Sequence, residues 1–252
     1  MNNPVLNDKV FRQSESESER VSSAEMTVKG TMTKTLLLLL MVAAGAAYSW
    51  TVFYESLNPS SVSAYMYGGL FGGFVLAMIV SFFPKTAPYL TPFYAAGEGL
   101  FLGGISAMYN AAFAETAPNI IFNAVALTLL TAVVMFTIYR KEIIKVTDKF
   151  RKVILISLTT ILIYYIVCMI LNLCGVNLDI LQGGNILSIV ISVVIVGVAA
   201  FSLLLDFDFI TKASQMGAPK YMEWYGAFGL VVTLVWLYLE ILKLLAKFAN
   251  RN

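Results

Sequence analysis

The sequence contains no histidine and only two cysteines among its 252 residues. Without histidine there is no Ser-His-Asp triad, no Cys-His pair, no HExxH zinc site and no histidine-ligated haem. Cys168 and Cys174 are six residues apart in an apolar run, about 240° apart around a helix, so we interpret them as small apolar residues rather than a disulfide. Ser106 lacks the second glycine of a nucleophile elbow, and no phosphate-binding glycine motif is present. We therefore expect no enzymatic activity and no resident cofactor.

Charged residues are also scarce, at 13% of the chain against roughly 25% in a typical soluble protein. Residues of the set AVILMFWYC make up 59%, too many for a soluble domain to bury. They gather in seven runs of about 20 residues, the length of a membrane-spanning helix, at 35–54, 64–83, 91–113, 119–139, 153–174, 186–210 and 228–248. Strands of a membrane barrel would alternate and be half as long. The sequence predicts an all-α, polytopic membrane protein with a seven-helix domain over 35–252.

Residues 1–34 have a different composition and are predicted to form a disordered cytoplasmic tail. Serine and glutamate alternate between Gln13 and Glu25, and these acids dilute the basic residues, which argues against nucleic acid as a partner. The connection at 211–227 is the longest, and Trp224 and Tyr225 make it a candidate for an interfacial helix.

Lysine and arginine predict the orientation in the membrane. Fourteen of the 17 fall in the tail and in the second, fourth and sixth connections, which share one side when every run crosses. The positive-inside rule then puts the N-terminus in the cytoplasm, and we expect a plasma or inner membrane. Seven crossings leave the C-terminus outside, although Lys243, Lys247 and Arg251 lie near it. Six crossings with a re-entrant last segment would bring it inside; the length of the last run favours seven.

Four acidic residues fall within the predicted spans: Glu98, Asp206, Asp208 and Glu240. Because carboxylates are costly in hydrocarbon, such residues are functional candidates by default. Asp206 and Asp208 point about 200° apart on a helix, so only one can face a pocket. Lys212 follows Asp208 by four residues, which favours a surface pair, and we therefore expect Asp208 to face outward and Asp206 inward.

The only basic residues within the predicted spans are Lys243 and Lys247, and Lys243, three residues after Glu240, cannot neutralise Glu98, Asp206 and Glu240 together. These carboxyls must then be protonated, hydrated or bound to a cation. Oxygen ligands without histidine or thiolate suit Ca²⁺ or protons. The alternative is that Glu240 simply pairs with Lys243, while the two aspartates are solvated at the membrane surface.

Small residues recur at four-residue spacing, which permits close approach of helices in lipid. We interpret the pairs as ordinary packing within the bundle, with a homo-oligomer interface as the alternative; they are Gly68 and Gly72, Gly69 and Gly73, and Gly99 and Gly103.

Several segments resemble a known family. Residues 206–210, reading DFDFI, and 237–242, reading LYLEIL, are similar to the sixth- and seventh-helix motifs of the Bax inhibitor-1 family, also called the transmembrane BAX inhibitor motif family. Residues 89–106 resemble the third helix of its bacterial branch, and Asn3-Pro4-Val5 and Lys34-Thr35 are similar too. The resemblance covers nearly the whole chain.

The resemblance implies a seven-helix fold with the last helix surrounded by the others, and a pH-sensitive calcium leak controlled by an acidic pair between helices six and seven. Asp206 matches the first acid of this pair by position, and Glu240 stands where the second is usually aspartate. The link between them is longer than in compact bacterial relatives. We expect a passive cation channel permeable to Ca²⁺, with Asp206 and Glu240 as pH sensor, gate and candidate Ca²⁺ contacts, and Glu98 and Asp208 along the ion pathway.

Two other functions fit the same residues. A proton-coupled transporter could use the same acids. A non-conducting regulator of membrane stress or proteolysis would instead bind a membrane protease, or another membrane protein, through the glycine faces.

Overall fold

The computed structural model describes residues 25–56, 59–175 and 185–251. Its helices are α2 (Val28–Ser56), α3 (Pro59–Phe82), the short 3-10 helix η1 (Pro84–Thr86), α4 (Ala87–Ala112), α5 (Ile120–Arg140), α6 (Asp148–Leu173), α8 (Ile186–Gln215) and α9 (Met222–Ala249). Six of the seven long helices are apolar enough to cross a membrane. The other, α4, contains Pro92, Glu98 and four glycines, which lower its hydropathy. The prediction of an all-α, polytopic membrane protein is confirmed.

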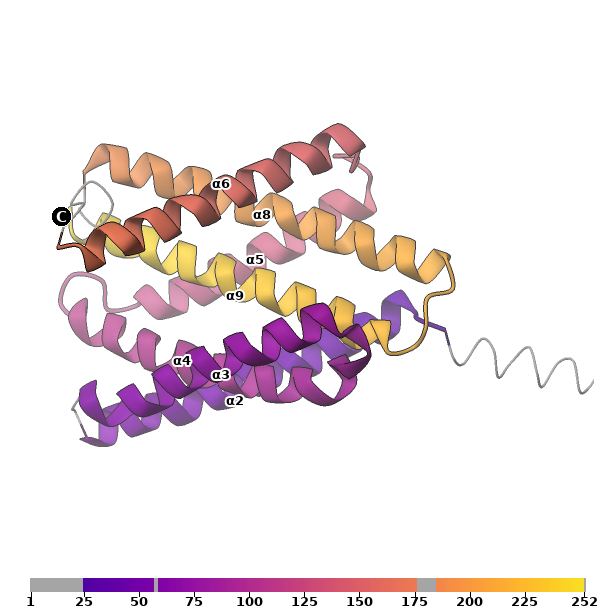
Figure 1. Cartoon of the computed structure of the whole chain (residues 1–252). Coiled ribbons are helices and arrows are strands. Elements are labelled where there is room, and N and C mark those ends of the chain that lie inside the picture. Colours follow the sequence, from indigo (N-terminus) through magenta and orange to yellow (C-terminus); the bar gives the residue numbers. More distant parts are fainter. Residues whose placement is uncertain (1–24, 57–58, 176–184, 252) are drawn as a thin grey trace, which may run out of the picture.

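Helix α9 is the centre of the bundle, as expected. It packs against α2, α4, α5 and α8, and its buried side chains form the largest share of the hydrophobic core. Figure 1 shows α9, in yellow, between a group formed by α2, α3 and α4 and a group formed by α5, α6 and α8. Helix α6 is peripheral and packs mainly against α8.

The last helix is continuous over 28 residues, about 42 Å at 1.5 Å per residue. It ends beside the C-terminus, at the opposite end of the bundle from the start of α2 (Figure 1). A continuous helix that runs the length of the bundle favours a crossing over a re-entrant last segment.

Two of the sequence predictions are wrong: the end of the disordered tail and the interfacial helix in the last connection. Helix α2 begins at Val28, so residues 25–34 are ordered, and Met26 is buried with its N–H donating to the carbonyl of Ala218 at 2.7 Å. The rest of the predicted disordered tail, residues 1–24, lies outside the described residues. The separate interfacial helix within 211–227 does not form either, because α8 continues to Gln215 and α9 begins at Met222.

Glycines allow α4 to pack closely against α2. A Cβ on Gly99 would lie 2.3 Å from the carbonyl oxygen of Val42, and one on Gly103 would lie 2.2 Å from that of Ala46, both on α2. The interpretation of the Gly99 and Gly103 pair as packing within the bundle is confirmed. Gly68 and Gly72 differ, because no described atom lies within 4 Å of their Cβ positions. Cys168 and Cys174 are both free thiols, as predicted.

Candidate functional site

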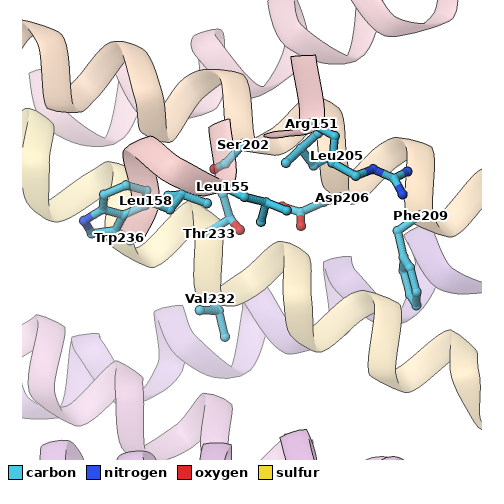
Figure 2. A pocket seen from close by; sticks show the side chains of 10 residues that line it. All are labelled: Arg151, Leu155, Leu158, Ser202, Leu205, Asp206, Phe209, Val232, Thr233 and Trp236. Atoms are coloured by element: carbon cyan, nitrogen blue, oxygen red, sulfur yellow. The ribbon is translucent and has the colours of Figure 1, made fainter. Parts of the chain in front are cut away.

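Asp206 lies in a cleft between α6, α8 and α9 with a volume of about 490 Å³. The walls are mostly apolar, and the polar groups are Arg151, Ser202, Asp206 and Thr233 (Figure 2). Residues 202, 205, 206 and 209 recur at the three- and four-residue spacing of one face of α8, which turns this polar set toward α6 and α9.

The carboxyl of Asp206 is hydrogen-bonded to the side chain of Thr233, and its Oδ2 is buried without a hydrogen-bond partner among the described residues. Arg151 lines the same cleft but forms its ion pair with Asp208 instead. In Figure 2 the guanidinium of Arg151 reaches toward the side where Phe209 lies, and the Asp206 carboxyl points toward Thr233. Asp206 therefore has no cationic partner within the described part of the chain.

Asp208 is not the outward-facing residue that the sequence predicted. Only 6% of it is exposed, and its Oδ2 accepts from Arg151 Nη2 at 2.6 Å and from Lys212 Nζ at 2.8 Å. The expected pair with Lys212 is confirmed. Arg151 comes from the start of α6 and supplies a second cation, which compensates for the desolvation of this buried carboxylate. Neither aspartate is simply solvated at the surface.

Glu240 lies in a second cleft, between α4, α6, α8 and α9, with a volume of about 690 Å³. It is 2% exposed, and its Oε1 accepts from Lys243 Nζ and from the Tyr165 hydroxyl, both at 2.9 Å. The alternative that Glu240 pairs with Lys243 is confirmed.

The expected contact between Asp206 and Glu240 is absent from the described structure. Asp206 meets Thr233, and Glu240 lies seven residues further along α9, about 10 Å along its axis. The reason is the register of the antiparallel α8 and α9, whose connection spans only residues 216–221. Within the described residues, no three acidic or cysteine side chains gather into a group that could hold a metal ion. A Ca²⁺ site shared by these two acids is therefore not preformed.

Glu98 is also separate from the other acids. It is half-buried on α4, hydrogen-bonded to Tyr94 one turn earlier, and its carboxyl lies beside Gly73 of α3. Among the described residues it forms no ion pair and no hydrogen bond with Asp206 or Glu240.

Sequence reasoning missed Glu223, an acid with no exposed surface at the start of α9. Its Oε1 accepts from Thr27 N at 2.9 Å, Thr27 Oγ1 at 2.8 Å and Lys220 Nζ at 3.0 Å, and its Oε2 forms an ion pair with Lys34. Gly30 leaves room for this carboxyl, because a Cβ there would lie 2.1 Å from Oε1. We call Thr27, Lys34, Lys220 and Glu223 the clasp. It ties the start of α2 to the α8–α9 connection.

The signal for the clasp was weak in the sequence. Glu223 fell in a segment interpreted as a connection, where an acid needs no partner. Lys220, three residues earlier, was the only local indication, and Lys34 is 189 residues away.

Comparison with known proteins identifies the family. The profile of the Bax inhibitor 1 like family matches residues 3–250. The comparison with curated proteins gives no match, and neither does the comparison with solved structures. Assignment to the bacterial branch stays a prediction. Because the matched region spans nearly the whole chain and the fold is a seven-helix bundle around a central last helix, the protein belongs to the Bax inhibitor 1 like family of membrane proteins.

Proposed function

We propose that the protein is a passive, pH-sensitive cation leak, permeable to Ca²⁺, whose pathway follows the interface of α6, α8 and α9. One observation carries the proposal: two clefts, each lined by an acid, lie in series along the same three helices. The first is lined by residues 151–158 of α6, 202–209 of α8 and 232–236 of α9. The second is lined by residues 164–168, 191–195 and 240–250 of the same helices, together with part of α4.

A short apolar barrier separates the two clefts. On α9, Leu237 is one turn from both Thr233 and Glu240 and on the same face, because its spacings are four and three residues. On α8, Ala199 lies on the same face as Asp206 and Ile195, two turns from Asp206 and one turn from Ile195, because its spacings are seven and four residues. Both Leu237 and Ala199 are fully buried. We assign this barrier, Leu237 and Ala199, as the closed gate, in place of a direct pair between Asp206 and Glu240.

Asp206 is the proposed pH sensor and cation contact. The polar groups that line the clefts around it are Arg151 from α6, Ser202 from its own helix, and Thr233 and Tyr225 from α9. Arg151 is held by Asp208, so an ionised Asp206 must obtain its compensation from a cation, water or a proton. Protons and cations then compete for the same carboxyl, and flux is expected to fall as the pH falls.

Ca²⁺ suits the first cleft because it prefers oxygen ligands. The Asp206 carboxyl and the hydroxyls of Ser202 and Thr233 line that cleft together. Glu240 is expected to contribute less, because Lys243 already neutralises it.

The orientation follows from charge. The Asp206 cleft lies nearer the end of the bundle that carries most of the basic residues, including Arg140, Arg151 and Lys212. We place this end in the cytoplasm, by the positive-inside rule, and the protein in a plasma or inner membrane.

Two other functions keep some support. A proton-coupled transporter is favoured by the missing cationic partner of Asp206, and flux that persists when the proton gradient is clamped would argue against it. A non-conducting regulator that binds a membrane protease or another membrane protein is favoured by the uncovered faces of Gly68 and Gly72.

The proposal is tested by Ca²⁺ entry into liposomes that contain only the purified protein, measured over a pH series around neutrality. Asp206→Asn keeps the shape of the side chain and removes its charge, so it should lower flux above neutrality and flatten the pH dependence. Asp148→Asn is the matched control, because Asp148 is exposed at the same end of the bundle. Wild-type flux and pH dependence in the Asp206→Asn variant would refute the role of Asp206. No flux in any protein would favour the regulator.

A further inference from the structure

The second cleft contains more positive than negative charge. Its charged side chains are Glu240, Lys243 and Lys247, all on α9. Glu240 and Lys243 neutralise each other at 2.9 Å, so the described lining carries one net positive charge, from Lys247. A cleft of this kind favours an anionic ligand.

Lys247 makes only neutral contacts. Its Nζ donates to Ser192 Oγ at 2.8 Å and to the carbonyl of Ser188 at 3.3 Å, and it has no acidic partner among the described residues. Lys243 lies one helical turn earlier, and both it and Glu240 are close enough to interact with Lys247, the attraction of Glu240 being the larger of the two. An anion placed between the two ammonium groups would accept hydrogen bonds from both and add the negative charge that balances the lining.

The position and the walls of the cleft indicate what kind of anion fits. Lys247 lies two residues before the end of α9 at Ala249, and this end of a membrane-spanning helix is expected at the level of lipid headgroups. Much of the remaining lining is apolar, with Met108 on α4, Phe113 at the C-terminal end of α4, and Ile191 and Ile195 on α8. A free inorganic anion would leave these walls unused, whereas a lipid would bring an acyl chain to cover them.

We propose that this cleft binds an anionic phospholipid, with the phosphate at Lys243 and Lys247 and one acyl chain along the walls formed by α4 and α8. Lysine side chains are common phosphate ligands, which bind the phosphate as point charges. The proposal adds a ligand to the second cleft, which the proposed cation pathway also uses, so a bound lipid is expected to restrict flux there. Lipid binding is measured without flux, so its failure and the failure of the cation leak are distinguishable.

The test is lipid binding by the full-length protein in neutral detergent, followed by native mass spectrometry and by the shift in thermal unfolding. Phosphatidylglycerol should bind and stabilise the protein, and phosphatidylcholine should do neither. Lys247→Gln should weaken phosphatidylglycerol binding about tenfold, since hydrogen bonds to charged groups contribute about that factor. Lys247→Arg should keep the binding, which guards against loss through misfolding.

Lys152→Gln is the matched control, because Lys152 is an exposed lysine at the other end of the bundle. Three results would overturn the proposal. One is equal binding of phosphatidylglycerol by Lys247→Gln and Lys152→Gln. The second is equal binding of the two lipids by the wild-type protein. The third is equal stabilisation by inorganic phosphate at the same concentration, which would show an anion site without a lipid role.

Discussion

Replacing Glu223 with glutamine is expected to loosen the N-terminal start of the bundle. The carboxyl of Glu223 is fully buried. It accepts hydrogen bonds from Thr27 and forms ion pairs with Lys34 and Lys220. Glutamine keeps the volume and one acceptor oxygen. It removes the negative charge and turns an amide N–H₂ toward a lysine, so at least one ammonium group loses its partner.

The size of the effect follows from the burial of the three charges. Removing one partner of a buried ion pair costs about 3–5 kcal/mol. The side chain of Lys220 is 48% exposed and can turn to water, whereas that of Lys34 is only 21% exposed. We therefore expect the low end, about 3 kcal/mol of unfolding free energy. For a chain of this length that corresponds to roughly 6–12 °C in Tm.

Thermal unfolding in detergent, followed by circular dichroism, measures the loss. Glu142→Gln is the matched control, because Glu142 and Lys145 also form a pair three residues apart, but at 3.9 Å and with both side chains about three-quarters exposed. Hydrogen exchange of the Met26 amide, which donates to Ala218, should accelerate only in Glu223→Gln. Equal Tm values for the two variants would refute the argument that the clasp stabilises the bundle.

Three other outcomes are expected. Gly99→Ala should destabilise the protein by about 1–3 kcal/mol in the same assay, because the added Cβ would clash with the α2 backbone. Gly72→Ala should be neutral or stabilising by up to about 1 kcal/mol, because the added Cβ has open space and alanine is a better helix former. Equal effects of the two substitutions would contradict the packing of α4 against α2. Asp208→Asn should cost about 2 kcal/mol, because a buried carboxylate with two cationic donors is lost, and an unchanged Tm would argue against that role. A reporter inserted in 141–147 should be cytoplasmic and one after Asn252 external, and the reverse pattern would invert the assigned orientation.

The helices themselves were predictable because each is a long apolar run, and lipid leaves a helix as the simplest way to satisfy its backbone. The ends were less predictable. Residues 28–34 are polar enough to be interpreted as part of the tail, yet they form the first turns of α2 because Glu223 holds Thr27 and Lys34 from the far end of the sequence. Ion pairs between residues so far apart in the chain leave no periodic signal in the sequence.

The acids show the same limit. Helical spacing identified the partners within one turn, Lys212 for Asp208 and Lys243 for Glu240. It could not reveal Arg151, which reaches Asp208 from another helix. Nor could it give the register of α8 against α9, which decides that Asp206 meets Thr233 rather than Glu240. Whether Asp208 or Asp206 is the more buried therefore depends on the ion pair with Arg151, a contact that only the folded bundle provides.

The central claim is that ions pass along α6, α8 and α9 and that a barrier containing Leu237 closes the path. Ca²⁺ flux into liposomes carrying Leu237→Ala tests it most directly, because truncation should connect the two clefts. Leu204→Ala is the control: Leu204 is also fully buried, but it lies on the face of α8 opposite Asp206. We predict that Leu237→Ala raises the flux above wild type while Leu204→Ala leaves it unchanged. Equal flux in the two variants would contradict this pathway.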